Sequence, residues 1–286
     1  VLFRSQYRES DFNFLARLME QEGMHFFFRH QNGKHTLIIA DSLKAHVAAD
    51  HYDEVPFREP EASHARVDEG IREWSHGAEI QPTRFIQRDF NFEKPRADMQ
   101  ADAGPARPLK HQHQAAFDIF DYPGEYEERG EGQRVAAVRI EEMRHQFDHF
   151  NGEGNAAGLA TGGVFKLLEH PRIDQNQEYL ITLADYRVEE SPLESELVTT
   201  ELISLRFRAI PSAQIFHPPR LTPKPIVQGP QTAIVVGPAG DEIYTDKYGR
   251  VKVQFHWDRY GKKDQNSSCW IRVSHPWAGQ NWGMIA

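Results

Sequence analysis

Histidine is the residue type that could most readily support chemistry in this sequence, because the chain contains 15 of them. His145 and His149 are four residues apart in a stretch, 131–149, whose apolar residues recur at helical spacing. Two histidines at that spacing lie on one face of a helix, as zinc ligands do. However, Gln146 follows His145, so the general-base glutamate of a metallopeptidase helix is missing. The apolar stripe lies on the opposite side of this stretch, and we therefore expect the two histidines to face solvent without a metal.

Other residues that could act in catalysis or metal binding also lack the sequence context that such a site requires. His111 and His113 fall in a polar stretch without a third ligand nearby. The 42 carboxylates cannot be placed from sequence at the separation of about 5–10 Å that a glycosidase needs. The serine hydrolase motif Gly-x-Ser-x-Gly is absent. Cys269 alternates with Trp270 in an expected strand, so we interpret it as a small buried apolar group.

A dinucleotide site is not indicated either. The short motif Gly152-Glu-Gly154 follows an expected helix, whereas the phosphate-binding turn follows a strand. The glycosylation signal at Asn266 is relevant only to a protein exported through a glycosylating pathway. We therefore predict no catalytic, cofactor-binding or metal-ligating residue, and no enzymatic activity.

The composition narrows the class of protein further. The chain has 286 residues with 39% hydrophobic side chains, which is enough for a packed core of one or two domains. Its formal charge of -9 disfavours general nucleic-acid binding. It contains no apolar run of about 18–20 residues that could span a membrane. A single cysteine cannot form an intrachain disulfide, so folding does not require an oxidising compartment.

The two ends of the sequence suggest that it is part of a longer protein. The chain begins at Val1, without an initiator methionine or a signal peptide. It stops at the apolar run Met284-Ile285-Ala286. An apolar strand at the end of a domain would leave an unpaired edge, so we expect more chain on both sides.

The N-terminal elements have the clearest local signals. Ser10 offers a cap for a helix that we expect to end at Gly23. Asn32-Gly33 separates two strand-like runs, which predicts a hairpin with a type I′ turn. Pairing around that turn places Phe28 opposite Leu37, and Phe26 opposite Ile39.

The middle of the chain is less periodic. We expect short strands at residues 71–74, 84–90, 117–122, 164–168, 179–186 and 202–210. The stretch 96–114 is predicted to be a surface loop, and 151–163 a glycine-rich break.

The pattern of apolar residues in the sequence changes after a proline-rich segment at 217–230. Val251, Val253 and Phe255 alternate with polar residues, as in the strands of a small antiparallel barrel. We expect these three to face the interior, and Lys252 and Gln254 to face solvent. Cys269, Ile271 and Val273 form a second alternating run.

This last part contains four tryptophans, Trp257, Trp270, Trp277 and Trp282. They could either stack on bases or sugars or pack against neighbouring side chains, and the sequence leaves both roles open. Residues 241–286 carry seven basic and five acidic side chains, a balance that disfavours a groove for nucleic acid.

The C-terminal run Tyr248-Gly-Arg-Val-Lys-Val-Gln-Phe-His-Trp257 is the most specific motif in the chain. Together with 229–237, 241–247, 267–273 and 277–283, it closely resembles the VgrG family, the spike proteins of the bacterial type VI secretion system. The N-terminal part resembles the hub region of that family in order, through the segments 6–12, 15–23, Asp121-Tyr-Pro-Gly124 and His170-Pro-Arg172.

The resemblance implies a mainly β fold with a few helices (α+β). Residues 1–216 would form a phage tail hub-like β-barrel region that lacks its N-terminal part, and 217–230 a linker. Residues 231–286 would form an OB-fold barrel at the base of the spike, without its C-terminal strands.

The resemblance also implies the partners and the location. The family forms a homotrimer that caps a hexameric Hcp-like tube, carries a PAAR-repeat tip protein, meets baseplate proteins and delivers secreted effectors through target membranes. It implies no cofactor, no nucleic acid and no stable membrane anchoring. The protein would assemble in the bacterial cytoplasm and then be secreted into the extracellular space or a target cell. For the present chain alone, we expect weak, concentration-dependent association.

Two alternative functions remain open at this point. One is the hub or spike of a contractile phage tail, which the sequence does not distinguish from a secretion spike. The other belongs to a different class, a cell-wall-degrading or metal-dependent hydrolase. It would require a cleft with paired carboxylates or three converging ligands.

Overall fold

The computed structural model describes residues 4–59, 68–104, 117–188, 203–277, 279 and 282–284. Strands outnumber helices among these residues, in agreement with the expected mainly β class. The helices are α1 (Asp11–Glu22), η1 (Leu43–Ala45), α2 (Arg129–Arg144) and η2 (Ile173–Gln175). The strands are β1 (His25–Gln31), β2 (Lys34–Ala40), β3 (Glu54–Pro56), β4 (Ile71–Ala78), β5 (Arg84–Gln87), β6 (Ala101–Ala103), β7 (Asp118–Asp121), β8 (Asp148–Gly154), β9 (Val164–Leu168), β10 (Glu178–Val188), β11 (Ile203–Pro211), β12 (Ala233–Val236) and β13 (Lys252–Phe255).

Residue contacts divide the chain into two units. The larger unit comprises Leu15–Pro223, and the smaller one combines Val1–Phe14 with Lys224–Ala286. We call them the hub unit and the C-terminal unit. The boundaries 1–216, 217–230 and 231–286 and the fold assigned to each remain predictions.

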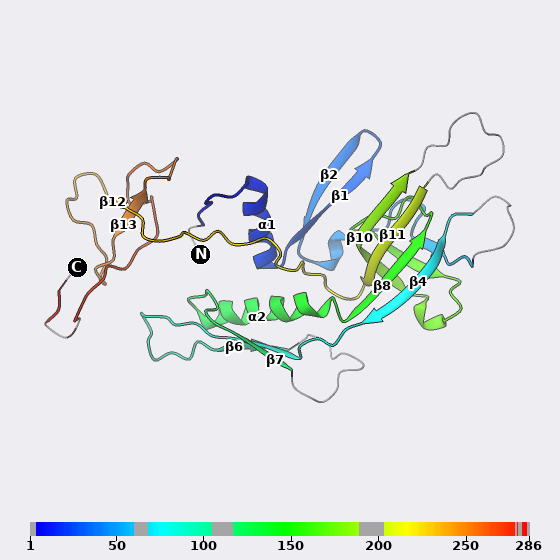
Figure 1. The fold of residues 1–286 in the computed structure, drawn as a ribbon, viewed down its shortest axis with the longest axis horizontal. Coiled ribbons are helices and arrows are strands. Elements are labelled where there is room, and N and C mark those ends of the chain that lie inside the picture. The colour runs from blue at the N-terminus through cyan, green and yellow to red at the C-terminus, as the bar shows by residue number, and fades with distance from the viewer. Residues whose placement is uncertain are drawn as a thin grey trace. The chain divides into compact units, whose positions relative to one another are not determined.

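A six-stranded sheet forms the main body of the hub unit, in the order β3-β9-β10-β11-β8-β4 (Figure 1). A parallel bridge between Phe57 and Ile71 links the chain just after β3 to β4, so the two outer strands of the sheet meet. The sheet therefore curls around one core, and we call this curled sheet the barrel. The core residues are Val55, Ile71, Phe150, Ala156, Leu159, Phe165, Leu167, Tyr179, Ile181, Leu205, Phe207 and Ala209.

Strand β8 corrects the first part of the expected glycine-rich break at 151–163, because it continues through Gly152 and ends at Gly154, while 155–163 form turns and irregular chain. Gly152 pairs with Phe207 of β11, and a Cβ at this glycine would lie 2.3 Å from the Phe207 ring. A Cβ at Gly154 would lie 2.2 Å from the Gly70 carbonyl oxygen. These glycines therefore admit a ring and a neighbouring backbone into close contact with the strand, which is a role for glycine within a sheet rather than a sign of a loop.

The N-terminal helix and hairpin agree with the expected elements. Ser10 Oγ accepts a hydrogen bond from the Asn13 N–H at 3.2 Å and caps α1. Phe28 pairs with Leu37, as the position of the turn predicts. The turn type was wrong, however: Gly33 has a positive φ of 70°, whereas Asn32 does not, and a type I′ turn needs both.

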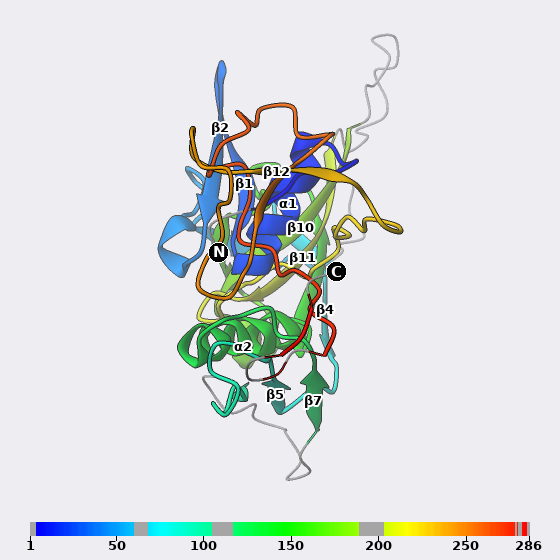
Figure 2. The same cartoon turned by 90° about the vertical axis from the view of Figure 1, so that its left-hand side faces the viewer.

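A three-stranded sheet, β6-β5-β7, packs one face against α2 (Figure 2). It corrects the expected surface loop at 96–114, because 101–103 is a strand and Met99 and Ala101 are buried; residues 105–114 lie outside the described part. The buried stripe of α2 consists of Gly132, Ala136 and Ile140 together with Arg139 and Glu141. Small side chains let the helix approach the sheet closely, and a stripe of this kind gives little hydrophobic signal in the sequence.

The C-terminal unit is built around the pair β12–β13. Its expected alternation is only partly correct, because Gln254 is buried along with Val253. The Gln254 amide explains this burial: its Oε1 accepts from the Lys263 N–H at 2.7 Å, and its Nε2 donates to the Gly261 carbonyl at 3.2 Å. A glutamine that satisfies loop backbone groups can replace an apolar side chain inside.

The second expected strand of the C-terminal unit, around 269–273, is reduced to a single bridge between Ile271 and Val251. Cys269 is exposed, so its interpretation as a buried apolar group was wrong. In the described part of the chain, no helix is both long and apolar enough to cross a membrane.

Candidate functional site

The structure separates the histidine pair that the sequence singled out. Helix α2 ends at Arg144, so His145 is its C-terminal cap, while His149 belongs to β8. The His145 Nδ1 hydrogen-bonds to the Glu142 carbonyl, and burial lowers the pKa of the His145 imidazole. His149 lies over Gly77 of the neighbouring strand β4. The expected solvent-facing helical pair is therefore wrong, because the helix ends before His149.

In the described residues, no group of three His, Cys, Asp or Glu side chains is placed to hold a metal ion. His111 and His113 lie outside these residues.

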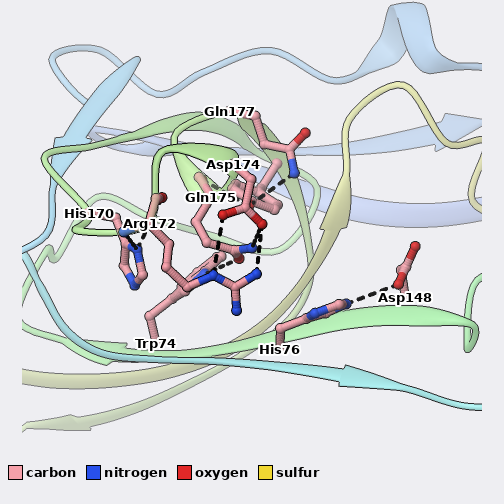
Figure 3. Close-up of polar contacts among 9 residues, drawn as sticks. Trp74, His76, Asp148, His170, Arg172, Asp174, Gln175 and Gln177 are labelled. Atoms are coloured by element: carbon pink, nitrogen blue, oxygen red, sulfur yellow. Dashed lines mark hydrogen bonds and ion pairs between the residues drawn. The ribbon is translucent and has the colours of Figure 1, made fainter.

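A polar network in the hub unit surrounds the loop between β9 and β10, which carries the motif His170-Pro-Arg172 (Figure 3). The side-chain amide of Asn176 forms two hydrogen bonds to the backbone of His170 across this loop. Its Oδ1 accepts from the His170 N–H at 2.9 Å, and its Nδ2 donates to the His170 carbonyl at 2.9 Å. The His170 Nδ1 accepts from the Arg172 N–H at 3.1 Å. The histidine of the motif therefore acts on the loop backbone.

Arg172 and Asp174 form a two-pronged ion pair within the same loop. The guanidinium donates from Nε at 3.2 Å and from Nη2 at 2.7 Å to the two carboxylate oxygens. This hydrogen bonding, together with that from Gln175, lowers the pKa of the Asp174 carboxyl. It also raises the pKa of Arg172. The pair stays charged, and its donors and acceptors are used within the loop.

Gln175 connects this pair to the core of the barrel. Its Nε2 donates to Asp174 at 2.8 Å, and its Oε1 accepts from the Trp74 indole N–H at 3.1 Å. The Tyr179 hydroxyl donates to the Gln175 carbonyl at 2.9 Å. The loop is thus tied to the core, while Ile173 at its tip is 85% exposed. This arrangement holds the apolar side chain of Ile173 at the surface. The acidic and basic groups of the network already bond to one another, so none of the atoms named here is left to act as a catalytic acid or base.

A histidine–aspartate pair lies on the same sheet, where His76 Nε2 is 2.9 Å from Asp148 Oδ1 (Figure 3). A catalytic triad would add a nucleophile beside this histidine. Ser75, the nearest hydroxyl along β4, points to the opposite face because successive side chains alternate across a strand. The ring of His76 instead stacks on Phe150 at 4.6 Å. We interpret the pair as a structural contact.

Sequence reasoning missed a second histidine pair, His25 and His46. Their Nε2 atoms are 3.2 Å apart, and His46 Nδ1 is 2.9 Å from the Gly162 carbonyl oxygen. A carbonyl only accepts, so His46 carries its proton on Nδ1, and its Nε2 accepts from the His25 Nε2–H. Burial and the neighbouring His46 lower the pKa of His25 to about 4. Twenty-one residues separate the two in sequence, so no spacing rule could pair them.

The tryptophans of the C-terminal unit divide into two groups. Trp257 stacks on Phe255 at 4.9 Å, and Trp270 packs against Tyr244 at 5.0 Å. Trp277 and Trp282 meet edge-on at 6.0 Å and are 79% and 60% exposed. All four tryptophans therefore contact another aromatic ring, and the last two are largely exposed.

The described residues thus combine a buried core with exposed apolar side chains. Comparisons with known proteins indicate the family to which the chain belongs. The family model of the phage tail baseplate hub (GPD) matches residues 2–192. The type VI secretion system spike proteins VgrG1a and VgrG1b of Pseudomonas aeruginosa are 42% and 43% identical to this chain, each over 98% of its length. The chain spans 43% and 37% of those relatives.

A solved structure has a similar fold over most of the length of this chain. It is the Escherichia coli c3393 protein, described as a component of the type VI secretion system with structural similarity to the T4 bacteriophage tail proteins gp27 and gp5. The TM-score is 0.55 at 18% identity, over 98% of this chain and 61% of that protein. The described sheets, the family match and the spike relatives agree with one another. The chain belongs to the phage tail baseplate hub (GPD) family, and its homologues include the VgrG spike proteins of type VI secretion systems.

Proposed function

We propose that this chain forms the hub and the base of the spike in a homotrimeric spike protein of a type VI secretion system. The assembled spike caps a hexameric Hcp-like tube, meets the baseplate and carries a PAAR-repeat tip. It delivers effectors through target membranes, after assembly in the bacterial cytoplasm and release into the extracellular space or a target cell. In this proposal residues 1–216 are the hub region, 217–230 the linker and 231–286 an OB-fold spike base.

One observation carries this proposal. The identity of 42% to VgrG1a extends over 98% of the chain, so it includes both the hub unit and the C-terminal unit. A phage tail hub match alone, which stops at residue 192, would not account for the second unit.

The role we propose is mechanical, without catalysis by the chain itself. The polar residues of the β9–β10 loop bond to one another and stabilise the loop, as in the Arg172–Asp174 ion pair. Peptidoglycan zymography of the purified chain should show no clearing, and metal analysis should show no stoichiometric zinc. Clearing or bound zinc would support the hydrolase alternative.

The test of the secretion role is a deletion in the producing bacterium. Deletion of the gene should abolish both the appearance of the tube protein in the culture medium and the killing of neighbouring cells. Complementation with the intact gene should restore both. Unchanged tube secretion in the deletion strain would contradict the proposal.

A contractile phage tail is the second candidate, favoured by the baseplate hub match over residues 2–192. It predicts that the protein leaves the cell in sheathed particles after induced lysis. In the secretion system, by contrast, the tube protein is released from intact cells.

A further inference from the structure

The chain that follows β11 is bonded to both long helices of the hub unit (Figure 1). Residues 216–222 belong to this unit, and we call them the strap. Thr222 donates to the two carboxylate oxygens of Glu20 on α1, from its N–H at 3.0 Å and from its hydroxyl at 2.7 Å. The Arg220 N–H donates to Glu142 Oε1 on α2 at 2.9 Å. Part of the predicted linker is therefore held against the hub unit.

Histidine rings surround the beginning of the strap. Phe216 meets the ring of His25 edge-on at 5.1 Å and the ring of His145 at 5.4 Å. The next residue, His217, has its Nδ1 2.7 Å from the Gly23 carbonyl oxygen and donates to it. Gly23 has a φ of 76°, and an added Cβ there would lie 2.8 Å from His217 Nδ1. A glycine at this position therefore lets the strap approach the end of α1 closely.

The hydrogen bonds of His25 leave no place for a second proton. Its Nε2–H donates to His46 Nε2 at 3.2 Å, while the His46 Nδ1–H donates to the Gly162 carbonyl. A proton added to His46 Nε2 would set two N–H groups against each other. A proton added to His25 Nδ1 would create a buried donor that has no hydrogen-bond partner among the described residues. The closed strap therefore requires both rings to be neutral.

The charges that face His25 act mainly in the same direction. Burial, His46 and His217 lower the pKa of His25 to about 4, and the Asp41 carboxylate opposes them with a smaller effect. Burial also lowers the pKa of His46, against the hydrogen bond to Gly162. The surroundings of the pair therefore do not offset the cost of a charge.

His145, on the other side of Phe216, has a similar environment. Burial lowers its pKa, and the carbonyl and the carboxylate of Glu142 oppose this effect. Arg208 on β11 and His217 in the strap add to the lowering. The strap thus lies between two buried imidazoles that it helps to keep from water.

The strap packs less tightly than the barrel beneath it. Phe216 and Pro218 line a cavity of about 220 Å³ together with His25 and Met19. Leu221, in the middle of the strap, is 79% exposed. Lifting the strap therefore breaks fewer apolar contacts than unfolding a strand of the barrel, and local opening of such a segment precedes global unfolding.

We propose that the strap is an acid-sensitive switch in the hub unit. Protonation of His25 and the histidines beside it releases residues 216–222 from α1 and α2, while the barrel stays folded. Release lets water solvate the charged rings, and it lengthens the connection between the hub unit and the C-terminal unit. The strap binds again when the rings become neutral. The switch does not require a trimer, so it applies to either candidate function.

The direction of the switch follows from the proton affinity of the two states. A ring with a pKa of about 4 under the closed strap returns toward the ordinary value of 6.5 when the strap opens. Both states are neutral at pH 7, and below pH 6.5 the open state binds the proton first. His25 alone would raise the ratio of open to closed strap by up to about 20-fold between pH 7 and pH 5.

Hydrogen–deuterium exchange followed by mass spectrometry measures this opening, after correction for the intrinsic pH dependence of exchange. The N–H groups of Arg220 and Thr222 report the strap, because each donates to a helix side chain. Residues 179–181 of β10 report the barrel. Protection in the strap should fall about 20-fold from pH 7 to pH 5, and protection in β10 should not change.

Two variants test whether the histidines control the strap. His25→Gln removes the ring with the lowered pKa and should reduce the acid response to about fivefold or less. His35→Gln, an exposed position near the turn of the same hairpin, is the matched control and should respond like the parent chain. Phe216→Ala removes the ring that covers the histidines. It should open the strap already at pH 7 and leave a smaller response to acid.

Circular dichroism should show that the parent chain and each variant are folded at pH 5, and Phe216→Ala serves as the test if His25→Gln does not fold. Strap protection that does not depend on pH would overturn the proposal. Equal loss of protection in the strap and in β10 would also overturn it, because acid would then unfold the whole unit. A full acid response in His25→Gln, or in Phe216→Ala, would show that these contacts do not control the strap.

Discussion

The hub unit and the C-terminal unit differ in how completely each covers its own apolar side chains. In the barrel, Ile71, Leu167 and Tyr179 are 0% exposed. In the C-terminal unit, the most buried apolar side chains that the structure describes are Val236 and Val253, at 7% and 8%. Among the described residues, the hub unit therefore has fully buried apolar side chains, whereas the C-terminal unit buries its own less completely.

The C-terminal unit compensates with hydrogen bonds inside its loops. The Asp246 carboxylate accepts from the Tyr248 and Arg250 N–H groups, each at 2.9 Å, and from Arg250 Nε at 2.6 Å. Asp258 accepts from the Tyr260 and Gly261 N–H groups at 3.1 and 2.9 Å. Such bonds shape a loop, but each contributes only about 0.5–1.5 kcal/mol, so they stabilise less than a buried aromatic cluster does.

The largest effect should come from truncation of an aromatic side chain inside the barrel. Phe165 is 1% exposed and meets Phe207 edge-on at 5.6 Å. Phe165→Ala should lower the free energy of unfolding by about 3–5 kcal/mol, because it leaves a cavity. The matched change in the other unit, Phe255→Ala, removes a half-buried ring and should cost about 1–2 kcal/mol.

Urea denaturation followed by circular dichroism and tryptophan fluorescence measures both losses. Equal losses for the two phenylalanines would contradict the difference between the units.

Acid should destabilise the hub unit through His25. Its pKa in the folded protein is about 4, below the ordinary value of 6.5, because burial disfavours the charged ring. Folding therefore favours the neutral form. The resulting stabilisation is complete above pH 6.5 and is lost as the pH falls toward 4, by up to about 3 kcal/mol at pH 4.

Thermal melts at pH 7 and pH 4.5 can detect this loss. His25→Gln should narrow the difference between the two melting temperatures, whereas a change at the exposed His256 of the C-terminal unit should not. An unaltered pH dependence in His25→Gln would show that another group is responsible.

The buried amide of Gln254 tests whether polar contacts really support the C-terminal unit. Gln254→Ala leaves the Lys263 N–H and the Gly261 carbonyl without their partner and should cost about 1–3 kcal/mol. Lys262→Ala, at an exposed neighbour in the same loop, serves as the control. Fluorescence-detected unfolding of the two variants should differ; if both behave like the parent chain, the loop contacts are dispensable.

The smallest effect should come from the exposed tip of the β9–β10 loop. Ile173→Ala should change the free energy of unfolding by less than about 0.5 kcal/mol, because the side chain is 85% exposed. Ile181→Ala, the same change at a side chain that is 1% exposed, should cost about 2–5 kcal/mol. A large loss at Ile173 would mean that the loop tip packs within the unit.

Local signals explain which elements could be predicted. The α1 cap at Ser10 and the register of the hairpin depend on residues within a few positions of each other. Strand β9 was placed at 164–168, as observed. The specific C-terminal run and the collinear hub motifs led to the correct family.

Sequence patterns failed where distant parts of the chain decide the environment. Gly152 was interpreted as part of a break because its partner ring, Phe207, lies 55 residues away in sequence. Arg139 is 1% exposed on the core stripe of α2, where its guanidinium donates to the carbonyls of Glu20 and Gln21 at 2.8 and 2.9 Å. A charged residue is buried only where such acceptors surround it, and periodicity does not reveal acceptors contributed by another helix.

The candidate site shows the same division. By itself, the sequence determined the local elements, the mainly β class and the family, because caps, turns and alternating strands depend on near neighbours and the motifs are contiguous. Only the tertiary structure decided that His145 and His149 separate, that His25 and His46 meet, and that Phe28 and Leu37 of the β1–β2 hairpin stay exposed. The reason is physical: burial and hydrogen bonding depend on which segments fold against one another, and that pairing is a property of the whole chain.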